Sequence, residues 1–281
     1  MTTFSLQALP DDAAGWLDLA RRAEEIGFEA LYVADHPGSC PAPFVALAAA
    51  AAVTARLRLG SYVANAGVRE PILLASDVAT LDVVSGGRAI LGLGAGHTPA
   101  EWAAVGKVRP GVRARVDHCI AVAEATRRML AGDGMEKPRP VQQPVPLLIG
   151  GGNTRLLGWA AEHADLIGLS GLGRTLDDGH GHEVRWHTGQ VDAQVELAGG
   201  KPIEALVQLV QVTDDAGAVY AEWAKDTSTP EEDLVAAPFM LAGTIEEIAA
   251  KIKAVESRWG ITRFAVRKPA IEVVEALLRR H

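Results

Sequence analysis

The sequence is poor in cysteine, in aromatic residues and in positive charge, and these shortages exclude whole classes of protein. Two cysteines in 281 residues, Cys40 and Cys119, cannot build a disulfide framework, and no Cys-x-x-Cys pair is present. Their scarcity predicts a reducing, cytoplasmic setting. Lysine and arginine total 27 against 35 acidic residues, a net charge of −8 without a basic stripe, which argues against binding to nucleic acid.

The sequence also lacks a hydrophobic run long enough to span a bilayer. The longest run covers residues 42–53 and is followed at once by Arg56 and Arg58, whereas a membrane-spanning helix needs about 20 apolar residues. We expect this run to form a buried helix. The first four residues lack the charged and apolar regions of a signal peptide. The sequence therefore predicts no contact with a membrane.

Short apolar runs alternate with longer amphipathic runs along the whole chain. Such alternation is typical of a parallel sheet whose two faces are covered by helices. Eight of the short runs predict strands, which cover residues 4–8, 29–34, 57–64, 88–93, 147–149, 165–169, 205–212 and 263–267. Eight strand–helix units in a chain of this length predict a (β/α)₈ barrel, and an open doubly wound sheet is the competing architecture.

No linker divides the chain, so we expect one barrel domain over residues 1–281. Its least regular part is an insertion near residues 171–200, and an acidic segment lies near residues 214–240. The histidines of the irregular stretch match no familiar metal-ligand spacing, so no metal site is expected. Thr244 and Glu247 form a capping-box pattern, which predicts that a helix begins at this point.

The active site of such a barrel lies where its strands end. The strand ends contain most of the polar residues and glycines that interrupt the apolar runs. The positions at these ends are Gln7, Asp35, His36, Ala64, Asn65, Ala95, Gly96, His97, Gly150, Gly151, Gly152, Leu169 and Ser170. Among them, His36 can act as an acid, a base or a hydrogen-bond donor to a ligand. The alternative is a structural histidine that holds the loop before Pro37.

Two glycine-rich segments end predicted strands. The first, residues 92–96, resembles a dinucleotide-binding turn, but His97 stands where that fingerprint needs its third glycine. Its glycines either allow close backbone packing or leave room for a flat ligand. The second, residues 150–152, precedes Asn153 and a predicted helix. Backbone N–H groups at such a turn suit a phosphate, and the alternative is a tight turn without a ligand.

Longer motifs carry a resemblance to the bacterial luciferase-like superfamily. Residues 79–88 read Ala-Thr-Leu-Asp-Val-Val-Ser-Gly-Gly-Arg and lead into the glycine-rich segment 91–96. Residues 146–157, which include the three successive glycines, and the segments 34–36 and 242–244 match as well. The resemblance covers essentially the whole chain, and it is greatest to the branch that uses the deazaflavin coenzyme F420.

This resemblance implies a luciferase-like TIM barrel that binds a flavin or deazaflavin at its mouth. A cis peptide bond in the third strand, at Tyr62–Val63 by position, lies against the ring in such proteins. The ring contacts implied by the resemblance are Asp35, Tyr62, Val63, Ala64, Asn65, Ala95 and Gly96. The implied phosphate contacts are Gly150, Gly151, Gly152, Gly168, Leu169 and Ser170.

The implied chemistry is hydride transfer between the deazaflavin and a small organic substrate. His36 would donate the proton or polarise the substrate. His97 occupies the place of an acid in a related sugar-phosphate dehydrogenase, so it either acts as the acid or lines the pocket. Two departures from the family affect cofactor binding: a short segment between Leu130 and Pro144, and few cations. The cations expected near the mouth or in turns are Arg69, Arg88, Arg155 and Arg174, of which Arg88 is expected at the far end of its strand.

Three functions follow from the sequence. The first is an F420-dependent oxidoreductase, and the second is an FMN-dependent monooxygenase of the same fold, because the two cofactors share the ring and first phosphate. The third is a barrel with weak or lost cofactor binding and a non-catalytic role. The resemblance also implies a homodimer.

Overall fold

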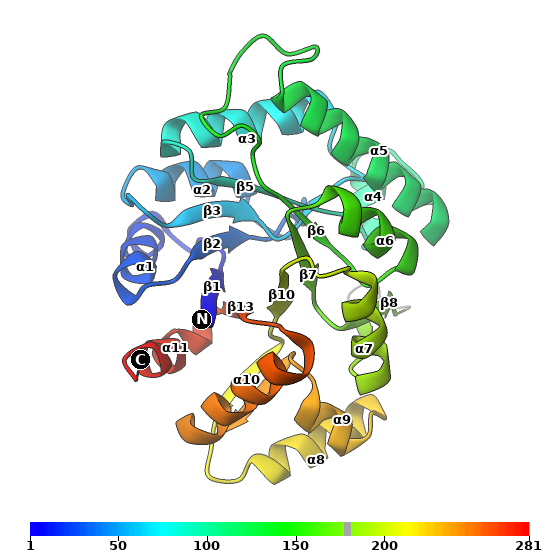
Figure 1. Cartoon of the computed structure of the whole chain (residues 1–281). Coiled ribbons are helices and arrows are strands. Elements are labelled where there is room, and N and C mark those ends of the chain that lie inside the picture. Colours follow the sequence, from blue (N-terminus) through cyan, green and yellow to red (C-terminus); the bar gives the residue numbers. More distant parts are fainter. Residues whose placement is uncertain (177–180, 281) are drawn as a thin grey trace.

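The chain forms a closed barrel of eight parallel strands with helices around it (Figure 1). The structure is a computed structural model that describes residues 1–176 and 181–280, so residues 177–180 of the expected insertion lie outside it. The barrel strands are β1 (Thr3–Gln7), β2 (Ala30–Val33), β3 (Arg58–Ser61) with β4 (Ala64–Asn65), β5 (Ala89–Gly94), β6 (Leu147–Gly150), β7 (Leu166–Leu169), β10 (Ile203–Leu206) and β13 (Arg263–Arg267). Pairing between β3 and β5 closes the ring. The expected (β/α)₈ barrel is confirmed, and the open sheet is excluded.

The helices lie where the amphipathic runs predict them, with one short addition. They are α1 (Ala13–Ile26), α2 (Pro43–Ala51), α3 (Pro71–Ser85), α4 (Pro99–Ala104), α5 (Val112–Leu130), α6 (Thr154–His163), α7 (Thr188–Leu197), α8 (Ala216–Thr227), α9 (Glu231–Ala236), α10 (Ile245–Trp259) and α11 (Ile271–Leu278), with a 3₁₀ turn at Lys268–Ala270. The expected capping box of Thr244 and Glu247 begins α10. Glycines in the left-handed conformation end α1, α3 and α10, as the C-cap of a helix favours.

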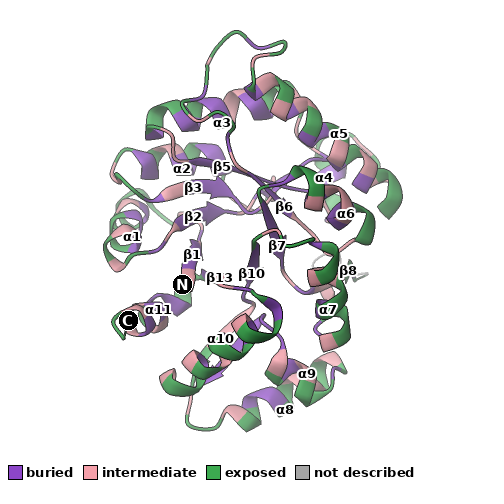
Figure 2. Cartoon of the chain, viewed as in Figure 1, coloured by how far each residue is buried: buried purple, intermediate pink, exposed green. Residues whose placement is uncertain are grey.

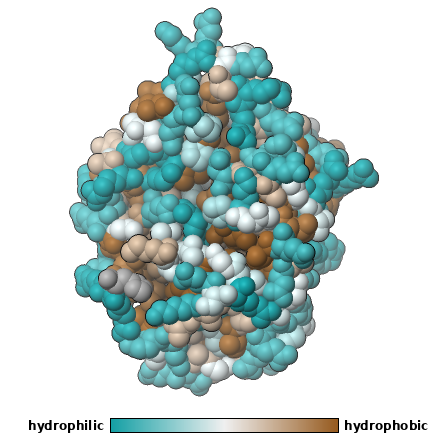
Figure 3. Space-filling view, in the orientation of Figure 1, coloured by the Kyte–Doolittle hydropathy of each residue, from teal (hydrophilic) through white to brown (hydrophobic). Residues whose placement is uncertain are grey.

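The strands are buried on both faces, as their continuous apolar runs predict (Figure 2). The main core lies between the barrel and its helices. A smaller cluster, which includes Tyr32, Tyr62, Ile90 and Leu148, fills the inside of the barrel. Hydrophilic side chains cover most of the face seen in Figure 3, with apolar areas between them. Among the described residues, no helix is both long and apolar enough to cross a membrane.

The third barrel strand is interrupted, which separates β3 from β4. The Tyr62–Val63 peptide bond between them is cis, as the family resemblance implied. Glycines of the neighbouring strand leave room for the interruption: a Cβ atom added at Gly92 would lie 1.8 Å from the backbone oxygen of Ser61. A Cβ atom at Gly94 would lie 2.6 Å from the side chain of Val63. These two glycines therefore make space for the chain itself.

The seventh predicted strand, 205–212, is wrong as a single element. Its first part is β10, whereas β11 (Leu209–Val212) leaves the barrel and pairs in parallel with β12 (Met240–Gly243). The switch occurs at adjacent residues: the amide of Val207 donates to Ala265 of β13, and that of Gln208 donates to Phe239. Since both parts are apolar, the sequence pattern does not reveal the break.

The expected insertion contains a two-stranded hairpin as well as α7. Its strands, β8 (Leu172–Thr175) and β9 (His182–Val184), are antiparallel. The Thr175 hydroxyl lies 3.4 Å from the carbonyl oxygen of His97, so the hairpin contacts the loop that follows β5. It thereby forms one wall of the barrel mouth.

Candidate active site

A cavity of about 1040 Å³ lies at the carboxyl ends of the barrel strands. All of the predicted site residues line it except Leu169, which is buried in the main core. The predicted residues in its wall are Asp35, His36, Tyr62, Val63, Ala64, Asn65, Ala95, Gly96, His97, Gly150, Gly151, Gly152, Gly168 and Ser170. Residues that are spread over most of the chain are thus brought together, as the barrel geometry requires.

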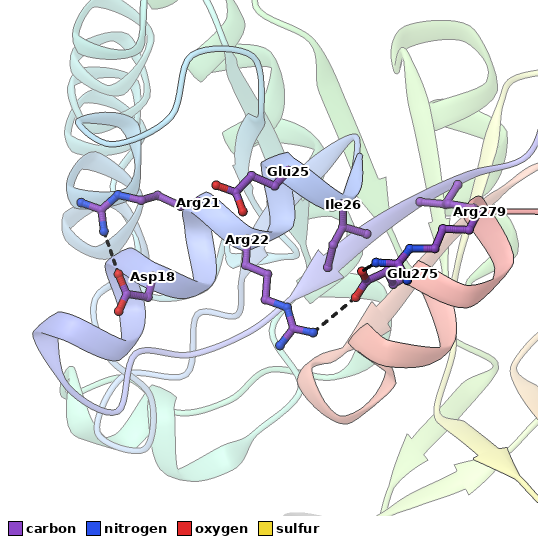
Figure 4. A pocket seen from close by; sticks show the side chains of 8 residues that line it. Asp18, Arg21, Arg22, Glu25, Ile26, Glu275 and Arg279 are labelled. Carbon is purple, nitrogen blue, oxygen red and sulfur yellow. Dashed lines mark hydrogen bonds and ion pairs between the residues drawn. The ribbon is translucent and has the colours of Figure 1, made fainter.

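A second, smaller hollow lies on the outer surface between α1 and α11 (Figure 4). Its charged side chains are paired with one another: Arg21 lies 2.8 Å from Asp18, and Arg22 lies 3.4 Å from Glu275. No histidine or glycine lines it among the described residues. The cavity at the barrel mouth is therefore the candidate active site.

His36 is held at the mouth by a carboxylate that the sequence analysis missed. Its Nδ1 atom lies 2.6 Å from Oε1 of Glu101, and the side chain of Glu101 is 4% exposed against 34% for His36. The hydrogen bond to Glu101 raises the pKa of His36, and burial opposes this only in part. Burial opposes ionisation of Glu101, but hydrogen bonds from His36, Thr98 and Asn65 lower its pKa on balance. The pair therefore favours an imidazolium beside a carboxylate.

Glu101 comes from α4, a helix of six residues that is too short to show a hydrophobic period. One signal in the sequence could have found it. Thr98-Pro99-Ala100-Glu101 is a capping-box pattern with proline at the first helical position. No side-chain hydrogen bond caps this helix at Thr98. The Glu101 carboxylate binds His36 and Asn65.

Asp35 and Asn65 hold together the elements that surround the cavity mouth. Both oxygens of the buried Asp35 carboxylate accept hydrogen bonds from Arg69, at 2.6 and 2.8 Å. One of them also accepts from the backbone N–H of Asn65 at 3.0 Å. The Asn65 side chain donates to Glu101 and accepts from the N–H of Gly67. Because these groups are occupied, Asp35 and Asn65 connect the ends of β2 and β4 to α4 rather than presenting open polar groups.

His97 packs between two other histidines of the mouth. Its ring centre lies 5.3 Å from that of His36 and 4.4 Å from that of His182. Burial, followed by the nearby charges of His182 and His36, lowers the pKa of His97 to about 4. His97 is consequently neutral near pH 7 and is a poor proton donor there. Of the two histidines, His36 is the one suited to acid–base work.

Glycines at the ends of three strands fit around the side chains of the cis peptide. A Cβ atom added at Gly150 would lie 2.6 Å from Val63, and one at Gly168 would lie 2.6 Å from the ring of Tyr62. Tyr62 is fixed at its other end, since its hydroxyl donates to the carbonyl of Glu204 at 2.9 Å. Gln7 donates to the carbonyl oxygen of Tyr62 at 2.6 Å. The glycines thus shape the floor of the cavity through Tyr62 and Val63.

The segment expected to hold a phosphate begins α6 at the edge of the cavity. Gly151 has a φ of 147°, a conformation that favours glycine. Its N–H donates to the carbonyl of Gly168 at 3.1 Å. The side chain of Asn153 accepts from the N–H groups of Arg155 and Leu156 and so caps the helix. One of the backbone N–H groups expected to bind a phosphate, that of Gly151, therefore already donates within the protein.

The expectations for the cations are partly confirmed, and Arg88 lies at the far end of its strand as expected. Arg69 is paired with Asp35, Arg155 is paired with Asp117, and Arg88 bonds to carbonyls at the opposite end of the barrel. Of the four, only Arg174 lines the cavity. Four arginines that the sequence analysis missed line it as well, namely Arg109, Arg115, Arg185 and Arg267. Positive charge at the mouth is therefore plentiful, although the whole chain carries −8.

The short segment between Leu130 and Pro144 does not border the cavity. It projects beyond α3 in Figure 1. Its Gln142 donates to Asp82 of α3 and to the carbonyl of Ala89, where β5 begins. The segment therefore lies at the strand starts, away from the cavity. No group of histidine, cysteine or acidic residues that could hold a metal occurs in the described part of the chain.

Comparison with known proteins places the chain in a family. Of the curated relatives, 5,10-methylenetetrahydromethanopterin reductase of Methanopyrus kandleri is 40% identical over 95 residues, 34% of this chain and 27% of that protein. An F420-dependent glucose-6-phosphate dehydrogenase of Kineococcus radiotolerans is 30% identical over 210 residues, 64% of this chain and 62% of that protein. The chain thus spans about a quarter and about three-fifths of the lengths of these two relatives.

Solved structures share the fold over nearly the whole chain. The coenzyme F420-dependent tetrahydromethanopterin reductase of Methanopyrus kandleri matches with a TM-score of 0.73 at 20% identity, covering 99% of this chain and 97% of that one. A long-chain alkane monooxygenase matches with a TM-score of 0.74 at 16% identity, covering 99% and 91%. Residues 3–187 match the family model described as luciferase-like monooxygenase. The chain belongs to the luciferase-like monooxygenase family.

Proposed function

We propose that the protein is an F420-dependent oxidoreductase that transfers a hydride between the deazaflavin and a small organic substrate. The observation that carries this proposal is the His36–Glu101 pair, which stands in the cavity wall with the cis peptide at Tyr62–Val63. Relatives whose names include F420 dependence support the choice of cofactor. No ligand specifies the substrate, so the proposal names its class only.

Several residues fit an anionic, ring-bearing cofactor. Tyr62 and Val63 form an apolar floor for a ring, and Gly152 and Asn153 lie at the start of α6, where a phosphate is favoured. Arg115 has a buried Nε atom without a hydrogen-bond partner, which a ligand oxygen would satisfy. When bound, the deazaflavin supplies a ring carbon that accepts or releases a hydride.

His36 handles the proton that accompanies the hydride. Oxidation of an alcohol would need a hydride acceptor, which a bound deazaflavin would supply, and neutral His36 would take the hydroxyl proton at Nε2. In the reverse direction, the imidazolium returns that proton to the carbonyl oxygen. Glu101 accepts from Nδ1, which fixes the ring so that Nε2 faces the reacting groups. Neutral His97 packs beside it and helps to exclude water.

A titration with the two cofactors tests this function. Purified protein is titrated with oxidised F420 and with FMN while ring fluorescence is followed. The proposal expects F420 to bind in the micromolar range and FMN to bind much more weakly. Tight FMN binding without F420 binding would instead favour a flavin monooxygenase, in line with the fold of the long-chain alkane monooxygenase. Binding of neither cofactor below about 100 μM would support a non-catalytic barrel.

We also propose that the protein works as a homodimer that pairs the outer faces of α2 and α3. The expected buried helix α2 exposes Val45 to 73%, and α3 exposes Leu73 to 63% and Val84 to 55%. Exposed apolar side chains on neighbouring helices are a feature of protein–protein contacts. Sedimentation should give twice the chain mass of 29.6 kDa, and a monomer at micromolar concentration would contradict the dimer.

A further inference from the structure

Two arginines of the cavity wall lack the acidic partners that similar arginines have elsewhere in the chain. Arg109 lies between α4 and α5, and Arg115 lies in the first turn of α5; both are half-buried and line the cavity. Among the described residues, no carboxylate lies within 4.0 Å of either guanidinium. By contrast, the half-buried Arg69 and Arg263 are paired with Asp35 and Glu29.

The contacts of the two arginines leave part of their hydrogen-bonding capacity unused. Arg109 donates from Nη1 to the carbonyl of His97 at 2.5 Å, and Arg115 donates from Nη1 to the carbonyl of Pro110 at 2.8 Å. The Nε atom of Arg115 is buried without a partner. Burial and the neighbouring charge of Arg109 lower the pKa of Arg115. Two like charges without a counter-charge are unfavourable in the empty cavity and favourable around an anion.

The acids of the cavity do not neutralise this pair. Among the described residues of its wall, only Asp35 and Glu101 are acidic. Asp35 binds Arg69 with both oxygens, and Glu101 binds His36 and Asn65. The positive charge of Arg109 and Arg115 is therefore left for a ligand.

The pair lies beside the segment where the cofactor phosphate is expected. Arg155 at the start of α6 binds Asp117 of α5 at 2.5 Å, which joins the first turns of the two helices. Val116 of α5 and Leu156 of α6 both line the cavity. A cofactor whose ring lies on Tyr62 and Val63 and whose phosphate reaches Gly152 would extend its tail toward this side.

We propose that Arg109 and Arg115 form a subsite for the anionic tail of the cofactor, the phosphate and carboxylate groups beyond the ring and ribityl chain. This inference rests on the proposed function and deepens it, because FMN lacks the carboxylate-bearing part of this tail. A planar guanidinium forms two parallel hydrogen bonds with such groups. The subsite also explains how a chain of charge −8 holds an anion.

The test separates binding of the tail from binding of the ring. Wild type, Arg115→Gln, Arg109→Gln and the control Arg113→Gln are titrated by fluorescence with three ligands. These are F420, the same deazaflavin ending at its phosphate, and the ribityl deazaflavin without phosphate or glutamates. Arg113 is the matched control because it stands in the same turn of α5 but is exposed and does not line the cavity.

The proposal expects each cavity variant to weaken F420 about 10- to 100-fold. The same variants should bind the ribityl deazaflavin within about twofold of wild type, and Arg113→Gln should leave all affinities within about twofold. If affinity falls for F420 alone, the glutamates contact the pair. If affinity also falls for the deazaflavin that ends at its phosphate, the phosphate contacts the pair. Equal loss for all ligands, or no loss for any, would overturn the subsite.

A failure of the proposed function gives a different result. If wild type binds FMN but neither deazaflavin, the F420 assignment fails, and the same variants are compared with FMN and riboflavin. Loss for FMN but not for riboflavin would keep the arginine pair as an anion subsite. Equal affinities of wild type and variants for FMN would overturn it.

Discussion

The two sides of the barrel mouth differ in how their charges are balanced. On one side, His36, Glu101, Asp35 and Arg69 form a network in which each charge has a partner at 2.6 Å. On the other side, the partners of Arg109 and Arg115 within residues 1–176 and 181–280 are backbone carbonyls, and one buried donor atom has no partner there. The comparison indicates that the balanced side is complete without a ligand and holds the proton-handling group in place. The unbalanced side becomes complete when an anion binds.

Removal of His36 should have the largest effect on activity. We expect His36→Ala to lower turnover by about 10²- to 10⁴-fold, because the proton then lacks a positioned acceptor. The measurement is the loss of F420 absorbance with a panel of secondary alcohols and sugar phosphates. His187→Ala is the control, since His187 pairs with Asp233 at 2.8 Å outside the cavity. An unchanged rate in His36→Ala would remove this residue from the mechanism.

Removing the charge of Asp35 should lower the free energy of unfolding. Asp35→Asn leaves Arg69 without its buried counter-charge, so we expect the free energy of unfolding to fall by about 3 kcal/mol. Urea denaturation measures this change. The matched control is Asp77→Asn, because Asp77 lies 3.4 Å from the same arginine with a side chain that is 43% exposed; its cost should stay below about 1 kcal/mol. Equal costs at the two positions would contradict a network centred on Asp35.

The pH dependence of the reaction rate tests the role of Glu101. The hydrogen bond from His36 to Glu101 raises the pKa of His36, so Glu101→Gln should lower it. His36 must be unprotonated to accept a proton during substrate oxidation, and the rate therefore rises with pH through its pKa. In Glu101→Gln this rise should move to lower pH, while Glu101→Asp should restore part of the wild-type profile. An unmoved profile would show that Glu101 has only a structural role.

Much of the fold follows from the sequence because the alternation of apolar and amphipathic runs reports burial directly. The strand break at residues 207–208 was not predictable, since both parts of the run are rich in apolar residues, although β10 is buried and β11 is half-buried to exposed. His36 was identified by its place at a strand end. Glu101 was missed because its helix is short and its partner, His36, lies 65 residues away along the chain.

The sequence also did not reveal why glycines stand at the strand ends. Their positions at strand ends 92–96 and 150–152 were visible, but their reason was not. Gly92, Gly94 and Gly150 make room for Ser61 and Val63, which a distant segment places against them. Arg109 and Arg115 could not be assigned to the cavity either. Arg109 stands in the connection between α4 and α5, and Arg115 in the first turn of α5, whose placement depends on that connection.

We propose that Arg109 and Arg115, and not the acidic residues Asp35 and Glu101, bind the cofactor. The most direct test compares the dissociation constants of F420 for Arg115→Gln and Glu101→Gln, measured by fluorescence under identical conditions. The account predicts affinity weaker by about 10-fold or more in Arg115→Gln and unchanged or tighter binding in Glu101→Gln, which loses a negative charge near the ligand. The opposite order, with Glu101→Gln weaker and Arg115→Gln unchanged, would contradict it.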